Sequence, residues 1–302
     1  MDTTKPQGGT ELMYEELMRR LDPKVLEKFS IFNYAVNADL TKRLVFWNQL
    51  SFDQDAVQFL RDSSTVDRIE RFVFVGNWQA ETYRKVFNIP GTKTHVIKNA
   101  CLGVEDREIK QKRKLKIAYT STPWRGLDVL LRAWELIDTK DIELHVFSSC
   151  KIYGEEFAKN SENQYQHLYE KCMRLENVIY RGSIPNEELR KEIVDFDILA
   201  YPNTFEETSC IAVIEALSAG LRVVCSNLGA LPETTEGWAR MYPFIIDPII
   251  HSQRFAKILQ EEIDKMKKGE LIDFLQKQMT IYKPKWSWDE RIKDWNYLFN
   301  IT

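Results

Sequence analysis

The chain contains no run of eighteen or more apolar residues, so the sequence predicts no membrane-spanning helix. Residues 1–9 are polar and lack the apolar core of a signal peptide. We therefore expect a cytoplasmic protein whose contact with a membrane is at most peripheral.

Residues that bind metals or form disulfides are few. The five cysteines are scattered, odd in number and without CxxC spacing, which indicates reduced thiols and no disulfide framework. The four histidines are equally dispersed, and no acidic cluster such as DxD ends a predicted strand. We expect no metal site and no cofactor.

The balance of charge argues against other functions. The net charge is −3 and the sequence has no basic stripe, so nucleic acid is not an expected partner. A dinucleotide-binding oxidoreductase is also disfavoured, because no GxGxxG follows a first strand. What remains is a globular chain, 44% hydrophobic and 29% charged, whose 302 residues suffice for about two domains.

Short β-like apolar runs alternate with amphipathic helical segments, which predicts an α/β fold with parallel sheets covered by helices. In the first third, we expect strands at residues 29–34, 43–47, 71–76 and 94–98, and helices at 11–21, 54–61 and 77–87. In a second unit, we expect strands at 115–119, 142–147, 178–180, 198–201 and 223–225, and helices at 127–137, 163–175, 187–194 and 211–219. Three further helices are expected at 252–266, 270–281 and 288–299.

The charged stretch 105–114, which lacks a long apolar face, separates the two units. It is either an interdomain linker or a solvated helix end. As a linker it divides the chain into domains at 1–108 and 109–285, with the aromatic-rich segment 286–302 packing back onto the first. The first helix has too few residues before it for a strand, so the first strand of this domain is missing or supplied otherwise.

The stretch 206–220 carries the most functional information. Glu207 lies on the loop after the predicted strand 198–201, and Glu215 lies eight residues later, about two turns further on, in the following helix. Ligands of α/β sheets bind at the carboxyl ends of strands, where helix N-termini offer free N–H groups. Two carboxylates beside such N–H groups suit a ligand that is both anionic and polyhydroxylated.

Other motifs have a functional and a structural interpretation. Arg125 stands at the head of the helix after strand 115–119, where its guanidinium either binds phosphate oxygens or lies on the surface. Gly8-Gly9 either lets the backbone approach a ligand or is a tail before a helix. The turn at 181–186 is either a platform for a base or a simple loop and cap. The turn at 228–233 either closes the cleft from the side or is a turn followed by a helix start.

Together these pieces resemble the retaining glycosyltransferases of family 4, which have the GT-B fold. The resemblance covers most of the chain and is strongest at residues 115–244 and 288–299. Its most specific part is the Glu-x7-Glu signature, here Glu207 and Glu215, in the order strand, Pro-Asn-Thr-Phe-Glu-Glu-Thr-Ser, Ile-Glu-Ala, Ala-Gly, strand. It implies two Rossmann-like domains with a cleft between them, the N-terminal acceptor-side domain shortened and the second binding the donor.

The resemblance also implies roles. Glu207 would contact the donor sugar, Glu215 would bind the ribose of the nucleotide, and Arg125 stands where the family commonly has a diphosphate-binding lysine. Glu207 and Arg125 are the implied catalytic residues. The N–H groups of residues 208–211 would hold the diphosphate and the sugar, the glycine pair would approach the diphosphate, and residues 183–184 would lie near the base. Besides Glu207, Glu215 and Arg125, the implied donor-binding residues are Gly8, Gly9, Ser121, Thr122, Ser183, Ile184, Thr208, Ser209, Cys210 and Ile211.

The implied reaction moves a sugar from a UDP-, GDP- or dTDP-linked donor to a hydroxyl of a glycan or other acceptor, with retention and without a metal. The chain departs from the family in three places. Its first strand is missing, residues 44–49 hold no histidine, and Ser121 or Thr122 stands where the family has a second phosphate-binding arginine. These departures favour the alternative of an inactive nucleotide-sugar-binding relative, or a subunit of a larger glycosyltransferase.

Overall fold

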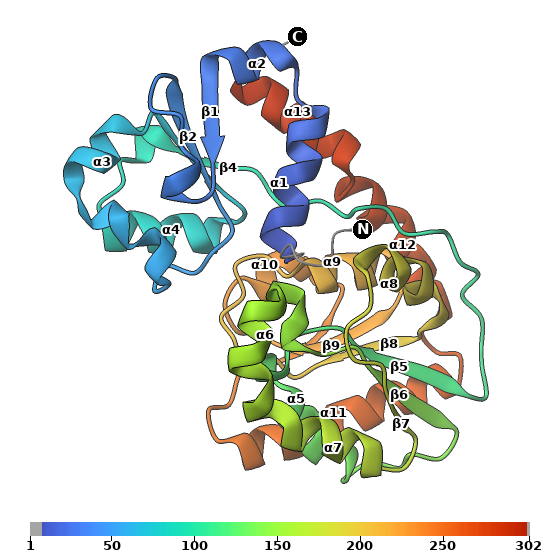
Figure 1. Cartoon of the computed structure of the whole chain (residues 1–302). Coiled ribbons are helices and arrows are strands. Elements are labelled where there is room, and N and C mark those ends of the chain that lie inside the picture. The colour runs from blue at the N-terminus through green and yellow to red at the C-terminus, as the bar shows by residue number, and fades with distance from the viewer. Residues whose placement is uncertain (1–7, 301–302) are drawn as a thin grey trace.

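The computed structural model describes residues 8–300 and contains two parallel sheets, each flanked by helices (Figure 1). The first sheet has the order β1-β2-β3-β4. Its strands are β1 (Phe29–Phe32), β2 (Arg43–Asn48), β3 (Arg71–Phe74) and β4 (Thr94–Val96). The helices of this part are α1 (Gly9–Arg20), α2 (Pro23–Lys28), α3 (Ser63–Arg68) and α4 (Asn77–Phe87). Within the described residues no strand precedes α1, so this sheet begins at β1.

The second sheet has the order β10-β9-β8-β5-β6-β7, and all its strand pairs are parallel. Its strands are β5 (Leu115–Tyr119), β6 (Ile142–Val146), β7 (Val178–Tyr180), β8 (Ile198–Tyr201), β9 (Arg222–Ser226) and β10 (Arg240–Tyr242). The chain extends from β5 through β6 to β7 and then returns to β8, on the other side of β5. The strand order therefore reverses between β5 and β8, which is where open α/β sheets bind their ligands.

Nine α-helices follow β5 in the described chain. They are α5 (Leu127–Trp134), α6 (Glu155–Ser161), α7 (Gln166–Arg174), α8 (Asn186–Glu192), α9 (Ile211–Ser218), α10 (Leu231–Thr235), α11 (Pro248–Lys267), α12 (Ile272–Lys285) and α13 (Trp288–Leu298). Short 3-10 helices are η1 (Ala35–Asn37), η2 (Asp55–Arg61), η3 (Gly91–Lys93), η4 (Pro123–Arg125), η5 (Cys150–Tyr153), η6 (Glu162–Tyr165) and η7 (Ile193–Asp195). No helix between residues 8 and 300 is long and apolar enough to cross a membrane.

The segment 54–61, predicted as an α-helix, forms the 3-10 helix η2 instead. Its two buried apolar side chains, Val57 and Leu60, are three residues apart. That spacing places both on one face of a helix with three residues per turn, so the tighter helix buries them together.

The charged stretch 105–114 forms neither a helix nor a strand, so its interpretation as a helix end is wrong. Arg107 fixes it to the segments that precede β8 and β9. The guanidinium of Arg107 is buried and donates to the backbone carbonyls of Val194, Phe196 and Gly220.

Helix α13 packs against the first sheet, although it is the last helix of the chain (Figure 1). Trp295 meets the ring of Trp47 on β2 edge-on, with centroids 5.1 Å apart, and Phe299 lies 4.8 Å from Phe29 on β1. Trp286, just before this helix, belongs to the core of the second sheet. The C-terminal segment thus connects the two halves through buried aromatic rings.

Candidate active site

A cavity of about 410 Å³ lies between the two halves of the molecule and is lined by both. Every residue that the sequence predicts for the site lines this cavity. From the first half these are Gly8 and Gly9. From the second half they are Ser121, Thr122, Arg125, Ser183, Ile184, Glu207, Thr208, Ser209, Cys210, Ile211 and Glu215. The structure brings these residues together from the head of α1, the loops after β5, β7 and β8, and helix α9, while their roles stay predictions.

The loop after β8 holds Glu207 in a fixed place. The backbone carbonyl of Glu207 accepts a hydrogen bond of 2.7 Å from the N–H of Ala230. Gly229 has φ +63°, and a Cβ there would lie 2.6 Å from the carbonyl oxygen of Glu207. Only glycine combines this backbone conformation with so close an approach.

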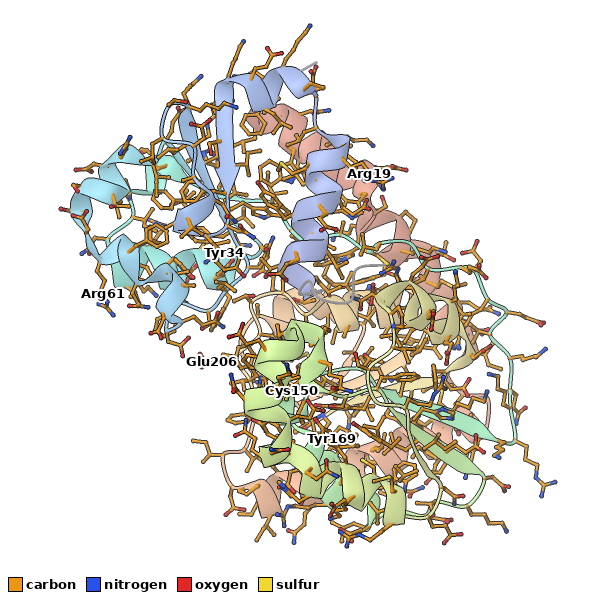
Figure 2. All side chains as sticks on the ribbon, in the orientation of Figure 1. Arg19, Tyr34, Arg61, Cys150, Tyr169 and Glu206 are labelled. Carbon is orange, nitrogen blue, oxygen red and sulfur yellow. The ribbon has the colours of Figure 1, made fainter. Side chains whose placement is uncertain are left out.

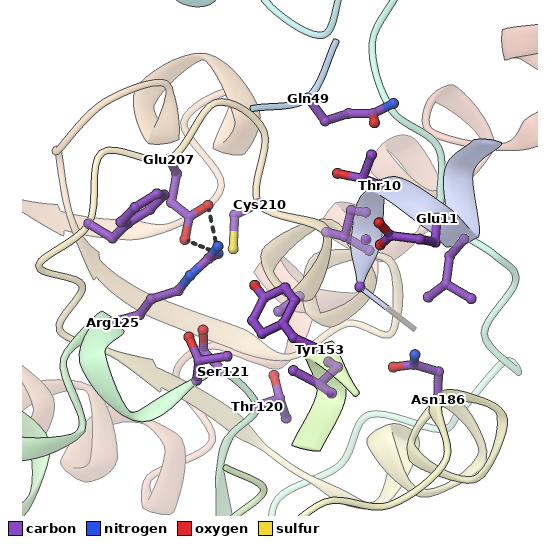
Figure 3. A pocket seen from close by; sticks show the side chains of 18 of the residues that line it. Thr10, Glu11, Gln49, Thr120, Ser121, Arg125, Tyr153, Asn186, Glu207 and Cys210 are labelled. Atoms are coloured by element: carbon purple, nitrogen blue, oxygen red, sulfur yellow. Dashed lines mark hydrogen bonds and ion pairs between the residues drawn. The ribbon is translucent and has the colours of Figure 1, made fainter. Parts of the chain in front are cut away.

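The buried carboxylate of Glu207 forms an ion pair with the partly buried guanidinium of Arg125 (Figure 3). Arg125 Nη1 donates to Glu207 Oε1 at 2.9 Å and to Oε2 at 3.2 Å, and the Tyr201 hydroxyl donates to Oε1. The guanidinium also lies over the ring of Phe205, 4.5 Å from its centroid. Burial by itself lowers the pKa of Arg125, but the Glu207 carboxylate together with Tyr153, Tyr201 and Cys210 more than offsets this, so the pKa lies well above its usual value. Arg125 is therefore a fixed positive charge.

The loops after β5 and β8 touch at Gly126. This residue has φ +119°, and a Cβ there would lie 2.2 Å from the backbone oxygen of Pro202. The close approach carries Arg125, the preceding residue, toward the loop that contains Glu207.

Replacing Gly126 with alanine is expected to cost about 3 kcal/mol or more of unfolding free energy, since it combines left-handed backbone strain with a steric overlap. Gly103 is the matched control, with φ +86° and nothing within 4 Å of an added Cβ. Gly103→Ala should cost only about 1 kcal/mol, from the backbone alone. Urea unfolding of the two variants checks this, and equal losses would show that the contact with Pro202 has no energetic importance.

Glu215 lies in α9 and lines the cavity. Burial raises the pKa of its carboxyl to about 7, and the positive charge of Arg190 opposes this only in part. No hydrogen bond to the Glu215 carboxylate is found between residues 8 and 300. A half-buried carboxyl without a partner among the described residues is available to accept hydrogen bonds from ligand hydroxyls.

The head of α9 meets the first half of the molecule. A Cβ on Gly9 would lie 2.6 Å from Ile211 Cδ1, at the first turn of α9. Thr208 Oγ1 donates to the backbone carbonyl of Gln49 at 2.7 Å. The first N–H groups of a helix have no partners within it and favour anions. This end of α9 therefore offers an anion site against the first domain.

Several cavity residues are absent from the sequence prediction. Trp124 and Tyr153 stack with centroids 5.8 Å apart, and Phe157 packs against both rings. Figure 3 shows Tyr153 between Arg125 and Glu11. A signal existed for Tyr153, because it lies in the loop after β6, at the same sheet edge as the loops after β5 and β8. The described residues contain no cluster of three or more His, Cys, Asp and Glu side chains placed to hold a metal ion.

Comparison with known proteins shows what this chain and its fold are similar to. Residues 115–261 match the family described as Glycosyl transferases group 1. The chain is similar to O-antigen chain mannosyltransferase B of Escherichia coli, with 24% identity over 195 residues, 60% of this chain and 50% of the other. It is also similar to an uncharacterized glycosyltransferase of Methanocaldococcus jannaschii, with 25% identity over 61% of this chain and 48% of the other. The chain spans half or less of the length of the curated relatives that it matches.

Among solved structures, HepE of Anabaena, determined with UDP and glucose, superposes with a TM-score of 0.68 at 14% identity, covering 86% of this chain and 72% of HepE. The two parallel sheets with a cavity between them have the GT-B architecture, so the predicted fold class is confirmed. Membership in family 4 and the retaining outcome remain predictions.

Proposed function

We propose that the chain is a glycosyltransferase that moves a sugar from a nucleotide diphosphate to an acceptor hydroxyl, with retention and without a metal. One observation carries the proposal. At the point where the strand order reverses, buried polar groups on the wall formed by the second half lack partners among the described residues. They are the hydroxyls of Thr122, Ser148 and Ser209 and the Nε of Arg125. A polar ligand satisfies such groups, which are costly to leave unpaired.

Charge and hydrogen-bonding capacity support the following position for the donor in this proposal. Its diphosphate lies against the head of α9 and Arg125, with Gly9 close by. Its sugar hydroxyls meet Glu207, its ribose hydroxyls meet Glu215, and its base lies near residues 183–184.

In the reaction, the bond between the anomeric carbon and the diphosphate oxygen breaks, and a bond to the acceptor oxygen forms on the same face. The acceptor proton passes to the departing phosphate oxygen. Arg125 and the N–H groups of α9 stabilise the charge that develops on the diphosphate, a preorganised electrostatic role. They do so without a metal in the proposed mechanism.

A nucleotide-sugar-binding relative without turnover, or a subunit of a larger enzyme, is the second candidate. It is favoured by the fact that Arg125 is the one cation among the described residues that line the cavity, and that this cation is already paired with Glu207. The Glu207 variant described in the Discussion separates the two candidates.

Thermal unfolding with UDP, GDP, dTDP and their sugar conjugates tests donor binding. At ten times its dissociation constant, the true donor should stabilise the protein by about 1.4 kcal/mol. Release of free sugar from the stabilising donor then measures turnover. If none of the panel shifts the unfolding midpoint and none is hydrolysed, the proposed function is wrong.

A further inference from the structure

We propose that the acceptor is an uncharged, polyhydroxylated molecule, a sugar or a similar polyol, and that Glu11 and Gln49 of the first domain bind it. This inference rests on the proposed function and names the substrate class for the acceptor half of the same cavity. It comes from two side chains that are neither among the predicted site residues nor in contact with the donor in its proposed position.

The wall of the cavity formed by the first half carries no positive charge among its described residues. Its described residues come from the head of α1, the loops after β1 and β2, and the segment after β4, and none of them is a lysine or arginine. Arg125, the cation of the cavity, lies on the opposite wall, where Glu207 holds it. Figure 3 shows Thr10, Glu11 and Gln49 on one side of the cavity and Arg125 and Glu207 on the other. Among the described residues, a ligand on the first wall therefore meets only negative and neutral groups.

Glu11 is held in position at this wall. It lies in the first turn of α1, and its Oε1 accepts a hydrogen bond of 3.2 Å from the hydroxyl of Tyr34. Tyr34 itself lies where the first half faces the second (Figure 2). A Cβ on Gly8 would lie 2.7 Å from Glu11 Oε2, so the glycine leaves room for the carboxylate. An ionised carboxylate only accepts hydrogen bonds, and it repels a second anion.

Gln49 supplies the complementary group. Its backbone is fixed by Thr208 Oγ1, whereas its side-chain Oε1 and Nε2 are both buried and have no partner among the described residues. A carboxamide left unpaired costs free energy, so a ligand that both donates and accepts is favoured beside it. A hydroxyl group does both.

A carboxylate and a carboxamide on one wall together recognise neighbouring hydroxyls. A phosphorylated or carboxylated acceptor would meet the Glu11 charge, with no compensating cation among the described residues of this wall. An apolar alcohol would leave the Gln49 carboxamide unpaired. The wall lies across the cavity from Glu207, so a hydroxyl bound here faces the donor sugar.

The first test is an acceptor panel with the wild-type chain and the donor found by thermal unfolding. The probes are neutral p-nitrophenyl hexosides, the matching p-nitrophenyl hexuronides and hexose phosphates. We expect at least one neutral hexoside to raise the rate of nucleotide release at least tenfold above the rate with water as the only acceptor. The anionic probes should raise this rate much less. An anionic probe that equals or exceeds the neutral ones, or a panel in which no neutral hexoside accepts the sugar, overturns the proposal.

Variants make the test specific to these side chains. Glu11→Gln and Gln49→Ala should raise the acceptor KM about tenfold, with a smaller change in the donor KM, and Glu11→Lys should shift preference toward the hexuronide. Glu15, exposed on the same helix, gives the control Glu15→Gln, which should change neither constant. An unchanged acceptor KM in Glu11→Gln also overturns the proposal. Absence of donor binding and hydrolysis instead refutes the proposed function, so the two failures are distinguishable.

Discussion

Glu207→Gln should reduce sugar transfer by a hundred- to a thousand-fold, the usual loss when one preorganised electrostatic group is removed. The substitution keeps the shape of the side chain and the hydrogen bond that the Tyr201 hydroxyl donates to it, but it removes the negative charge that faces the donor sugar. Affinity for the nucleoside diphosphate alone should stay equal or rise, because Arg125 loses its carboxylate partner and becomes free to pair with phosphate. Turnover assays and calorimetric titration of UDP, GDP or dTDP measure both effects.

This variant also destabilises the fold, so its controls matter. Breaking one side of a buried ion pair costs about 3 kcal/mol. Glu262→Gln breaks another buried pair, in which Arg222 Nε lies 2.6 Å from Glu262 Oε2, away from the cavity. It should lose stability but keep its rate of transfer, and Glu206→Gln, at the exposed neighbour of Glu207, should change neither. Full transfer in Glu207→Gln, or an equal loss in Glu262→Gln, would contradict the assigned role.

Glu215→Gln should weaken nucleotide binding by about ten- to a hundred-fold at pH 8, through loss of a charge-assisted hydrogen bond. In the wild type the pKa of Glu215 is about 7, because the carboxyl is buried, so its ionised fraction rises between pH 6 and pH 8. Ribose hydroxyls donate best to the ionised form. Nucleotide affinity of the wild type should therefore increase over this range, and that of the variant should not. Titration at both pH values checks this. Inorganic pyrophosphate, which has no ribose, is the control ligand, and Glu215→Gln should leave its affinity unchanged.

The same variant should stabilise the free protein. The folded pKa is raised above the unfolded value near 4.5, so the folded state binds more protons between these limits and wild-type stability falls as pH rises from about 4.5 to 7. At pH 8 Glu215→Gln avoids this loss and should be more stable by on the order of 2 kcal/mol. Two results would contradict the view that Glu215 is a half-buried carboxyl without a partner among the described residues. One is a nucleotide affinity of the wild type that does not change with pH, and the other is a variant that is no more stable than the wild type.

The sequence predicted the two sheets well, because most strands are separate apolar runs between helical patterns. It missed β10 (Arg240–Tyr242), which is three residues long, and α6 (Glu155–Ser161), in which little beyond Ala158 packs into the core. Of α10 (Leu231–Thr235), a single turn that contains a proline, it gave only the helix start, as one of two interpretations. Elements this short lack the periodicity on which such predictions depend.

The loops of the site were predictable because adjacent parallel strands end at the same edge of a sheet. The pairing of Arg125 with Glu207 was not predicted. It depends on the register of β5 against β8, in which Ile117 lies opposite Ile198, and on the contact of Gly126 with Pro202. The proposed role of Gln49 was also not predicted, because it rests on side-chain atoms that have no hydrogen-bond partner among the described residues. Such features depend on tertiary geometry and have no sequence pattern of their own.

The central claim, that this cavity transfers a sugar with retention, is tested most directly by proton NMR of the reaction. The donor selected by thermal unfolding is mixed with the wild-type chain and a neutral hexoside, and the anomeric configuration of the new glycosidic bond is read before equilibration. We predict that the wild type forms a product with the anomeric configuration of the donor, and that this product is lost with Glu207→Gln. An inverted product, or no product from a donor that binds, would contradict the account.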